Sequence, residues 1–301
     1  MHAKHFSYLL VLAMFFWGAG WPALKVLTYS LPLEVVSFWR FFLMIFAFIP
    51  ILIYLKKPPV LNLEALKYVL PSALLNVLFM VFAFIGVQKG FAGSGGVIIT
   101  TLSPVLTFML VSLLFKKHPP KMQLVGLVVG FVGGLIMLKV TTLLSDFNGA
   151  EFYFLLCALV WAVLTVISQR SHSVIHPVHY NFYIAIFATI ILLFIALPYD
   201  IMAVKDEDAT FWSALLYLAI FGQTIATTIY FIASGKLGSA HASSYMFLVP
   251  LFALVTSYIL LGERVETHIV LGGGVTLLGV YLINRSQKLK SKPFTKKVII
   301  K

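Results

Sequence analysis

Residues 35–55 read VVSFWRFFLMIFAFIPILIYL, an unbroken apolar run in which Arg40 is the only charged residue. A helix needs about 20 residues to cross the roughly 30 Å hydrocarbon core of a bilayer. A run of this length does not fit a membrane β-barrel, where lipid-facing and lumen-facing residues alternate over about 10 positions. The stretch therefore predicts a transmembrane helix, and the rest of the chain repeats the pattern.

The whole chain has the composition of a membrane protein. Of its 301 residues, 61% are hydrophobic and 11% are charged, whereas soluble domains average about 45–50% and about 25%. Further apolar runs cover residues 6–27, 66–87, 93–115, 123–138, 152–168, 178–197, 211–233, 239–261 and 268–283. Together with residues 35–55, they predict an all-α membrane protein with ten transmembrane helices.

The distribution of basic residues predicts the orientation. With the N-terminus in the cytoplasm, most Lys and Arg residues fall on the cytoplasmic side, as the positive-inside rule requires. We therefore expect a multi-pass protein of the cell inner membrane with both termini cytoplasmic. The net charge of +12 is explained by this topology and does not indicate a nucleic-acid partner.

The first apolar run has an alternative interpretation. Lys4, the apolar stretch 6–16 and the small residues Gly18 and Gly20 also fit a cleavable signal peptide. Its removal would leave nine helices and would break the symmetry between the two halves of the chain.

The two halves match each other when the chain is shifted by about 145 positions. The matched pairs are Trp17 and Trp161, Pro32 and Pro177, Pro104 and Pro250, Gly126 and Gly272, and Gly133 and Gly279. We interpret residues 1–140 and 150–285 as two five-helix repeats, followed by a basic cytoplasmic tail at 286–301. Because five is odd, the second repeat would enter the membrane inverted, as in many transporters. The alternative is a chance match between apolar sequences rich in Gly and Pro.

Several of these positions also carry a family resemblance. They are Trp17-Gly18 with Lys25, Arg40, residues 93–104, residues 238–250, and Leu261-Gly262-Glu263. With them the chain resembles the EamA-type branch of the drug/metabolite transporter superfamily from about Tyr8 to Asn284. The resemblance implies a ten-helix carrier, often an exporter of amino acids, other small metabolites or drugs, with a central cavity between its halves.

Polar and aromatic side chains inside the apolar runs are the candidate substrate-binding residues. They are Trp17, Trp21, Lys25, Arg40, Asn76, Thr100, Trp161, Gln223 and Tyr245. An ionisable group in hydrocarbon costs at least about 2.5–3.5 kcal/mol, so Lys25 and Arg40 need water, a partner or a substrate. If they face a cavity, its positive charge favours a carboxylate-bearing solute. Snorkelling of both side chains to the membrane surface is the alternative.

Other candidates have structural alternatives of their own. Trp21 is equally suited to anchor a helix at the membrane interface, and Thr100 can hydrogen-bond its own helix. His241, at the predicted start of the ninth helix, is the gating or coupling candidate. A lone cysteine, Cys157, excludes an internal disulfide and a multi-cysteine metal site. We expect no metal site and no cofactor.

The apolar runs hold no Asp or Glu near their centres, so a carboxylate proton relay has no candidate. We therefore expect uniport or exchange, or coupling through backbone carbonyls. The sequence as a whole predicts a transporter, not an enzyme, which exports an amino acid or a similar carboxylate-bearing or amphipathic solute by alternating access. The alternatives are a non-transporting membrane receptor or assembly subunit, and a membrane-embedded enzyme. A homodimer is left open.

Overall fold

The computed structural model describes residues 3–28, 30–56, 58–89, 92–116, 120–137, 149–261 and 267–288. Within these ranges every regular element is a helix, and there is no strand. Eight helices are long and apolar enough to cross a membrane, and residues Lys121–Met137 and Val270–Arg285 form shorter apolar helices. The prediction of an all-helical membrane protein is confirmed.

The first half of the chain forms uninterrupted helices close to the predicted boundaries. They are α1 (Ala3–Thr28), α2 (Leu33–Leu55), α3 (Leu63–Lys89), α4 (Ala92–Phe115) and α5 (Lys121–Met137). Leu10 and Met14 of α1 are fully buried in the core. These side chains pack α1 into the interior of the bundle.

The second half of the chain differs from the prediction in the eighth and ninth of the ten predicted helices, residues 211–233 and 239–261. Its elements are α7 (Ala150–Ser171), α8 (Pro177–Ala196), the 3-10 helix η1 (Ile201–Asp206), α9 (Ala209–Tyr217), the π-helix η2 (Leu218–Ala226), α10 (Thr227–Leu237), α11 (Ser239–Ser244), the 3-10 helix η3 (Tyr245–Leu248), α12 (Val249–Leu261) and α13 (Thr267–Lys288). The eighth segment is thus a helix with a π-helical centre, and a 3-10 turn interrupts the ninth. Residues 262–266, with Gly262 and Glu263, and the tail from residue 289 lie outside the described part of the chain.

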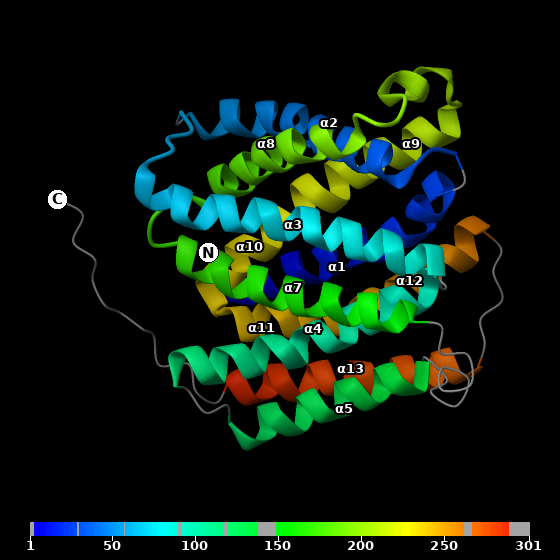
Figure 1. The fold of residues 1–301 in the computed structure, drawn as a ribbon. Coiled ribbons are helices and arrows are strands. Elements are labelled where there is room, and N and C mark those ends of the chain that lie inside the picture. The colour runs from blue at the N-terminus through cyan, green and yellow to red at the C-terminus, as the bar shows by residue number, and fades with distance from the viewer. Residues whose placement is uncertain are drawn as a thin grey trace.

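The helices run side by side in one bundle (Figure 1). Helices α2 and α8 pack together at one edge, and α5 and α13 pack together at the opposite edge. Between these pairs lie α1, α3, α4, α7 and the broken segments α9–α12. The start of α1 and the end of α13 lie at the same end of the bundle (Figure 1).

Helices α5 and α13 approach each other through glycines. A Cβ atom on Gly133 would lie 2.7 Å from the backbone oxygen of Gly272, and a Cβ on Gly272 would lie 2.6 Å from that of Gly133. Gly126 and Gly279 have the same reciprocal relation, with 2.8 Å in both directions. Because these neighbours are backbone atoms that cannot move aside, no larger residue fits at this crossing.

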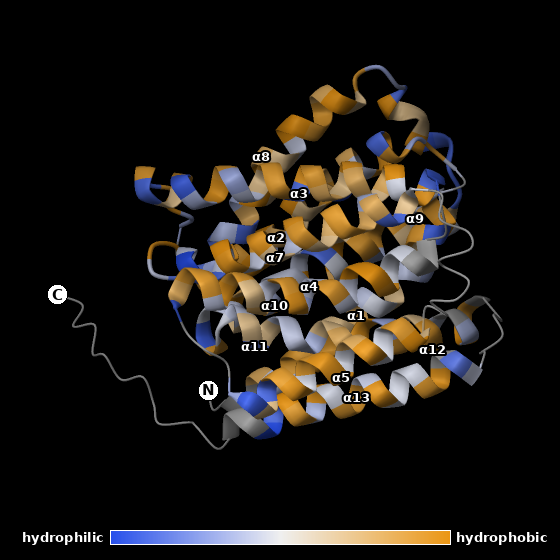
Figure 2. Cartoon of the chain, turned by 60° about the horizontal axis from the view of Figure 1, so that its bottom comes forward, coloured by the Kyte–Doolittle hydropathy of each residue, from blue (hydrophilic) through white to orange (hydrophobic). Residues whose placement is uncertain are grey.

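The outer faces of the helices are apolar. Large side chains such as Leu113, Phe194 and Leu271 are more than half exposed. Figure 2 shows apolar residues along the flanks of the helices and hydrophilic residues mainly at their ends and in their connections. A soluble protein rarely exposes apolar patches of this extent; the surface is suited to contact with lipid tails.

Candidate functional site

A cavity of about 130 Å³ lies between the two halves of the chain. Its lining comes from α1, α2, α3 and α4 of the first half and from α7, η2, η3 and α12 of the second. The lining extends from Trp17 and Trp161 in mid-helix to Thr28 and Leu33 on either side of the α1–α2 connection. The cavity therefore reaches towards this end of the bundle, which we call the α1–α2 end.

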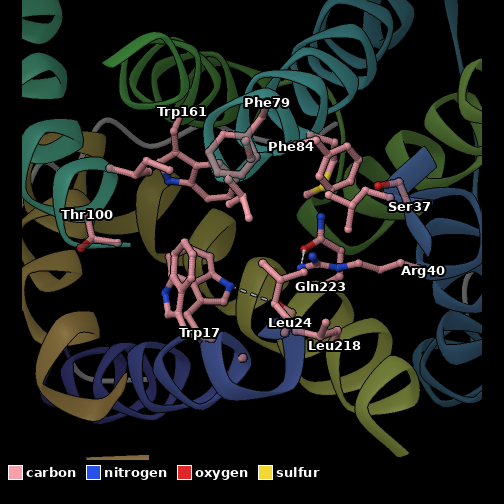
Figure 3. Close-up of a pocket in the computed structure, with 18 of the residues that line it drawn as sticks. Trp17, Leu24, Ser37, Arg40, Phe79, Phe84, Thr100, Trp161, Leu218 and Gln223 are labelled. Atoms are coloured by element: carbon pink, nitrogen blue, oxygen red, sulfur yellow. Dashed lines mark hydrogen bonds between the residues drawn. The ribbon is translucent and has the colours of Figure 1, made fainter. Parts of the chain in front are cut away.

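Aromatic rings form the deep part of the cavity. The ring centroids of Trp17 and Trp161 lie 5.2 Å apart in an edge-to-face arrangement, and those of Phe79 and Trp161 lie 5.4 Å apart. Tyr230 packs against Trp17 at 5.0 Å. In Figure 3, Trp161 and Phe79 lie on one side of the cavity and Trp17 lies opposite them. The rings of Trp17, Phe79 and Trp161 line the cavity and offer a broad apolar surface to a solute.

Arg40 and Gln223 form the polar part of the cavity, and they point towards each other (Figure 3). Arg40 Nη2 donates a hydrogen bond to Gln223 Oε1 at 3.0 Å. Arg40 is the only charged residue of the lining, which includes no carboxylate among the described residues. Glu34 lies six residues before Arg40 on α2, a spacing that does not put the two side chains on one helix face, and its Oε1 accepts a hydrogen bond from the Tyr199 hydroxyl at 3.2 Å.

The π-helix η2 places Gln223 in the cavity and is held by neighbouring helices. Trp17 Nε1 donates to the backbone oxygen of Gly222 at 3.0 Å, and Asn181 Nδ2 donates to that of Gln223 at 3.2 Å. Within η2, Thr224 Oγ1 donates to the backbone oxygen of Ala219, five residues earlier. The wider turn of a π-helix is frequent at functional sites.

The cavity brings together six of the predicted substrate-binding residues. They are Trp17, Trp21, Arg40, Thr100, Trp161 and Gln223. The hydroxyl of Thr100 donates to the backbone oxygen of Gly96 on its own helix at 2.7 Å, so it is already satisfied without a ligand. Trp21 packs over Gly96 of α4.

Three predicted residues lie away from this cavity lining. Lys25 is exposed near the end of α1, a position that suits snorkelling. Asn76 is buried and donates to the backbone oxygen of Ser72 on its own helix at 2.8 Å. The Tyr245 hydroxyl donates to Asn284 Oδ1 at 2.8 Å. The latter two side chains therefore satisfy their polar groups within the bundle.

The bundle is closed between the cavity and its opposite end, where the chain passes from α2 to α3 and which we call the α2–α3 end. Leu10, Met14, Tyr180, Tyr230 and Phe231 are fully buried there and belong to one apolar cluster. A solute cannot pass through packing of this density without movement of the helices.

Polar contacts reinforce this closure. Ser168 Oγ donates to Ser234 Oγ at 3.0 Å, joining α7 to α10. The backbone N of Ser239 donates to Gln169 Oε1 at 2.8 Å, joining α7 to α11. His241 is also buried in this region, and its ring lies 5.5 Å from that of Tyr245.

Some lining residues were missed by sequence reasoning. Ser37 lies on α2 one turn before Arg40, and its Oγ is buried without a hydrogen-bond partner. The spacing of three residues puts Ser37 and Arg40 on one helix face, and this was the signal available. Phe79 and Gly222 carried no such signal, because similar residues occur throughout the apolar runs.

Comparison with known proteins decides the family. The model of the EamA-like transporter family matches residues 6–139 and again residues 148–285. The chain belongs to the EamA-like transporter family. It is therefore a multi-pass membrane protein of transporter type, and the resemblance found in the sequence is confirmed. Membership implies a small-molecule substrate and a lipid bilayer as its surroundings.

Several relatives of this EamA-like protein are named transporters. An uncharacterized transporter of Synechocystis is 31% identical, with 93% of this chain and 90% of the relative covered. A chloroplastic WAT1-related protein of Arabidopsis thaliana is 29% identical, with 91% and 68% covered. A solved crystal structure with 15% identity has a TM-score of 0.72 and covers 96% of this chain; at that identity it supports the fold alone.

Proposed function

We propose that this protein exports a small amphipathic or carboxylate-bearing metabolite, a class that includes amino acids, by alternating access. The observation that carries this proposal is the cavity itself. It is lined from both halves of the chain, extends towards the α1–α2 end and is closed towards the α2–α3 end. Such a cavity is the arrangement expected of one state of an alternating-access carrier.

An inverted repeat of residues 1–140 and 150–285, with five membrane helices in each, is part of the proposal. The packing supports it. In the first repeat α3 and α4 pack against α7, which begins the second repeat, and the corresponding elements of the second repeat, η2 and α12, pack against α1, which begins the first. The reciprocal contacts of Gly126 with Gly279 and of Gly133 with Gly272 have the form expected across a two-fold axis. The double match of one family model to the chain points the same way.

The proposed orientation places the α2–α3 end and both termini in the cytoplasm of a cell with this protein in its inner membrane. Described basic residues at the helix ends on that side include Lys56, Lys116, Lys121, Arg170 and Lys236. The η1 region at the other end carries the acidic residues Asp206, Glu207 and Asp208. An anionic solute would be concentrated at the basic side and repelled at the acidic side, which supports export.

The orientation predicts the compartment of both termini. Reporter fusions at the N-terminus and at the C-terminus should both be active only as cytoplasmic reporters, because an even number of crossings separates them. Green fluorescent protein and alkaline phosphatase fusions measure this directly. Termini on opposite sides of the membrane would contradict both the orientation and the helix count.

The proposed binding site consists of the six cavity residues, with His241 in the closing layer as the gating candidate. We expect Trp17→Ala and Arg40→Ala to reduce transport at least about fivefold, since each removes a main contact surface of the solute. The measurement is flux of a metabolite panel in proteoliposomes, with expression and thermal unfolding of each variant as controls. Lys25→Ala, away from the cavity lining, should retain the rate.

The same experiment separates the transporter from its rivals. A receptor or assembly subunit would produce no protein-dependent flux in any gradient. A separate measurement supports the distinction, because thiol reagents would not reach cysteines introduced in the cavity of such a protein. A membrane enzyme would convert a solute instead of moving it. Wild-type flux in both Trp17→Ala and Arg40→Ala would remove these residues from the site.

A further inference from the structure

The cavity holds buried polar groups that have no hydrogen-bond partner in the described part of the chain. Among the described residues that line it, the buried side-chain atoms without a hydrogen bond are Ser37 Oγ, Arg40 Nε and Trp161 Nε1. Each of them carries a hydrogen to donate. A buried donor left unpaired costs about 1–3 kcal/mol. The missing partner is therefore a hydrogen-bond acceptor.

The charge balance of the cavity points to an acceptor that is also negative. An arginine side chain stays charged in proteins. In the described part of the chain, the only hydrogen-bond partner of the Arg40 side chain is the neutral amide oxygen of Gln223. One of the nitrogens along the edge of the guanidinium, Nη2, is thus occupied, and the adjacent Nε is not. Two parallel hydrogen bonds from such an edge to one carboxylate form the strongest pairing that Arg makes.

We propose that Arg40, Ser37 and Gln223 form a seat for the carboxylate of a monoanionic organic acid, whose apolar body packs against the aromatic rings of the cavity. This inference rests on the proposed function of the cavity as the transport site, and it narrows the proposed substrate class to carboxylates without an ammonium group. The carboxylate displaces Gln223 Oε1 from Arg40 and accepts from the guanidinium edge. Ser37, on the same face of α2, supplies a further donor.

The lining also selects against a second charged group on the solute. An α-ammonium group, as in an amino acid, needs carboxylates or other strong acceptors, and the described lining contains no Asp or Glu. The rings of Trp17 and Trp161 attract a cation less strongly than a carboxylate would attract it. A zwitterion would therefore lose more hydration than it regains, and a simple carboxylate anion would not.

The apolar body of the acid has a matching surface. Trp17, Phe79, Phe84 and Trp161 line the cavity together with Arg40. Figure 3 shows the indole of Trp17 across from Phe79 and Trp161, while Arg40 and Gln223 are displaced to one side. An aryl or branched aliphatic chain attached to a carboxylate fits this separation of polar and apolar parts.

Binding of four matched probes to the purified protein tests the inference. The probes are phenylpropionate, its neutral amide phenylpropionamide, zwitterionic phenylalanine, and the cation phenethylammonium, with affinity measured by tryptophan fluorescence and by thermal unfolding. We expect phenylpropionate to bind at least about tenfold more tightly than the other three. Arg40→Gln should abolish this preference, because it weakens the binding of phenylpropionate far more than that of phenylpropionamide.

Two further variants keep the test specific. Arg40→Lys retains the charge but lacks the planar guanidinium that donates two parallel hydrogen bonds, so it should show an intermediate preference for phenylpropionate over the amide. Lys205→Gln removes an exposed positive charge near the same end of the bundle and should retain the full preference.

The inference is overturned by equal affinity for acid and amide, by tighter binding of phenylalanine, by a preference that survives Arg40→Gln, or by no binding of phenylpropionate at millimolar concentration. Flux of another solute in proteoliposomes would then still support the transport function. Selective binding of phenylpropionate without any flux would instead contradict transport and leave the carboxylate seat intact.

Discussion

Replacing Gly272 by leucine lowers the unfolding temperature of the protein by roughly 2–12 °C, because α5 and α13 can no longer touch. Even a methyl group at this position would lie 2.6 Å from the backbone oxygen of Gly133 and 2.7 Å from the backbone N of Met137. Overpacking of this kind costs about 1–3 kcal/mol, and each kcal/mol shifts the midpoint by roughly 2–4 °C in a protein of this size class.

Gly274 provides a matched control on the same helix. It lies two residues away, is exposed, and a Cβ on it would meet no atom within 4 Å. Gly274→Leu should therefore leave the midpoint within about 1 °C of the wild type, or raise it through better helix propensity. Thermal unfolding in detergent followed by tryptophan fluorescence measures both variants. Should Gly272→Leu fail to express, Gly272→Ala is the milder test, and equal midpoints for Gly272→Ala and Gly274→Ala would contradict the close contact.

The membrane helices could be predicted from the sequence because each leaves a signal in composition alone. A run of about 20 consecutive apolar residues fits little besides a membrane crossing, as residues 35–55 illustrate. The match of Trp17 with Trp161 could also be read from the sequence, and these two rings are in contact in the structure. The sequence did not reveal that the eighth segment contains a π-helix, since no residue in Leu218–Ala226 requires one.

The rotation of each helix was the main obstacle to predicting the site. In a soluble helix the polar face marks the solvent, but these helices are apolar on nearly all sides and lack that marker. Asn76 therefore looked like a cavity residue, although its amide donates to its own helix at Ser72. Arg40 was predictable because a charged side chain in hydrocarbon is costly unless it has a partner, water or a substrate. Phe79 also lines the cavity, but it is one of 27 phenylalanines, and nothing in the sequence distinguishes it from the others.

Gln223→Glu weakens the binding of phenylpropionate by a factor of about 10 to 150 and at the same time raises the unfolding temperature. The introduced carboxylate sits where Gln223 Oε1 now accepts from Arg40 Nη2 at 3.0 Å, so the protein supplies its own anion to the guanidinium. Hydrogen bonds to charged groups are worth about 1.5–3 kcal/mol, and the solute loses this contribution. Stability rises because a buried charge without a counter-ion is costly and is now paired.

The opposite signs of the two effects make this variant informative, because a damaged protein would lose both binding and stability. The backbone of residue 223 keeps its hydrogen bond from Asn181, so η2 should stay in place. Gln88→Glu, at an exposed position near the end of α3, adds the same charge outside the cavity and should change neither property. Neutral phenylpropionamide should lose less affinity for Gln223→Glu than phenylpropionate does, because its bond to Arg40 lacks the charge of a carboxylate. Undiminished affinity of Gln223→Glu for phenylpropionate would show that the anion does not depend on a free Arg40, and the proposed carboxylate seat would then be wrong.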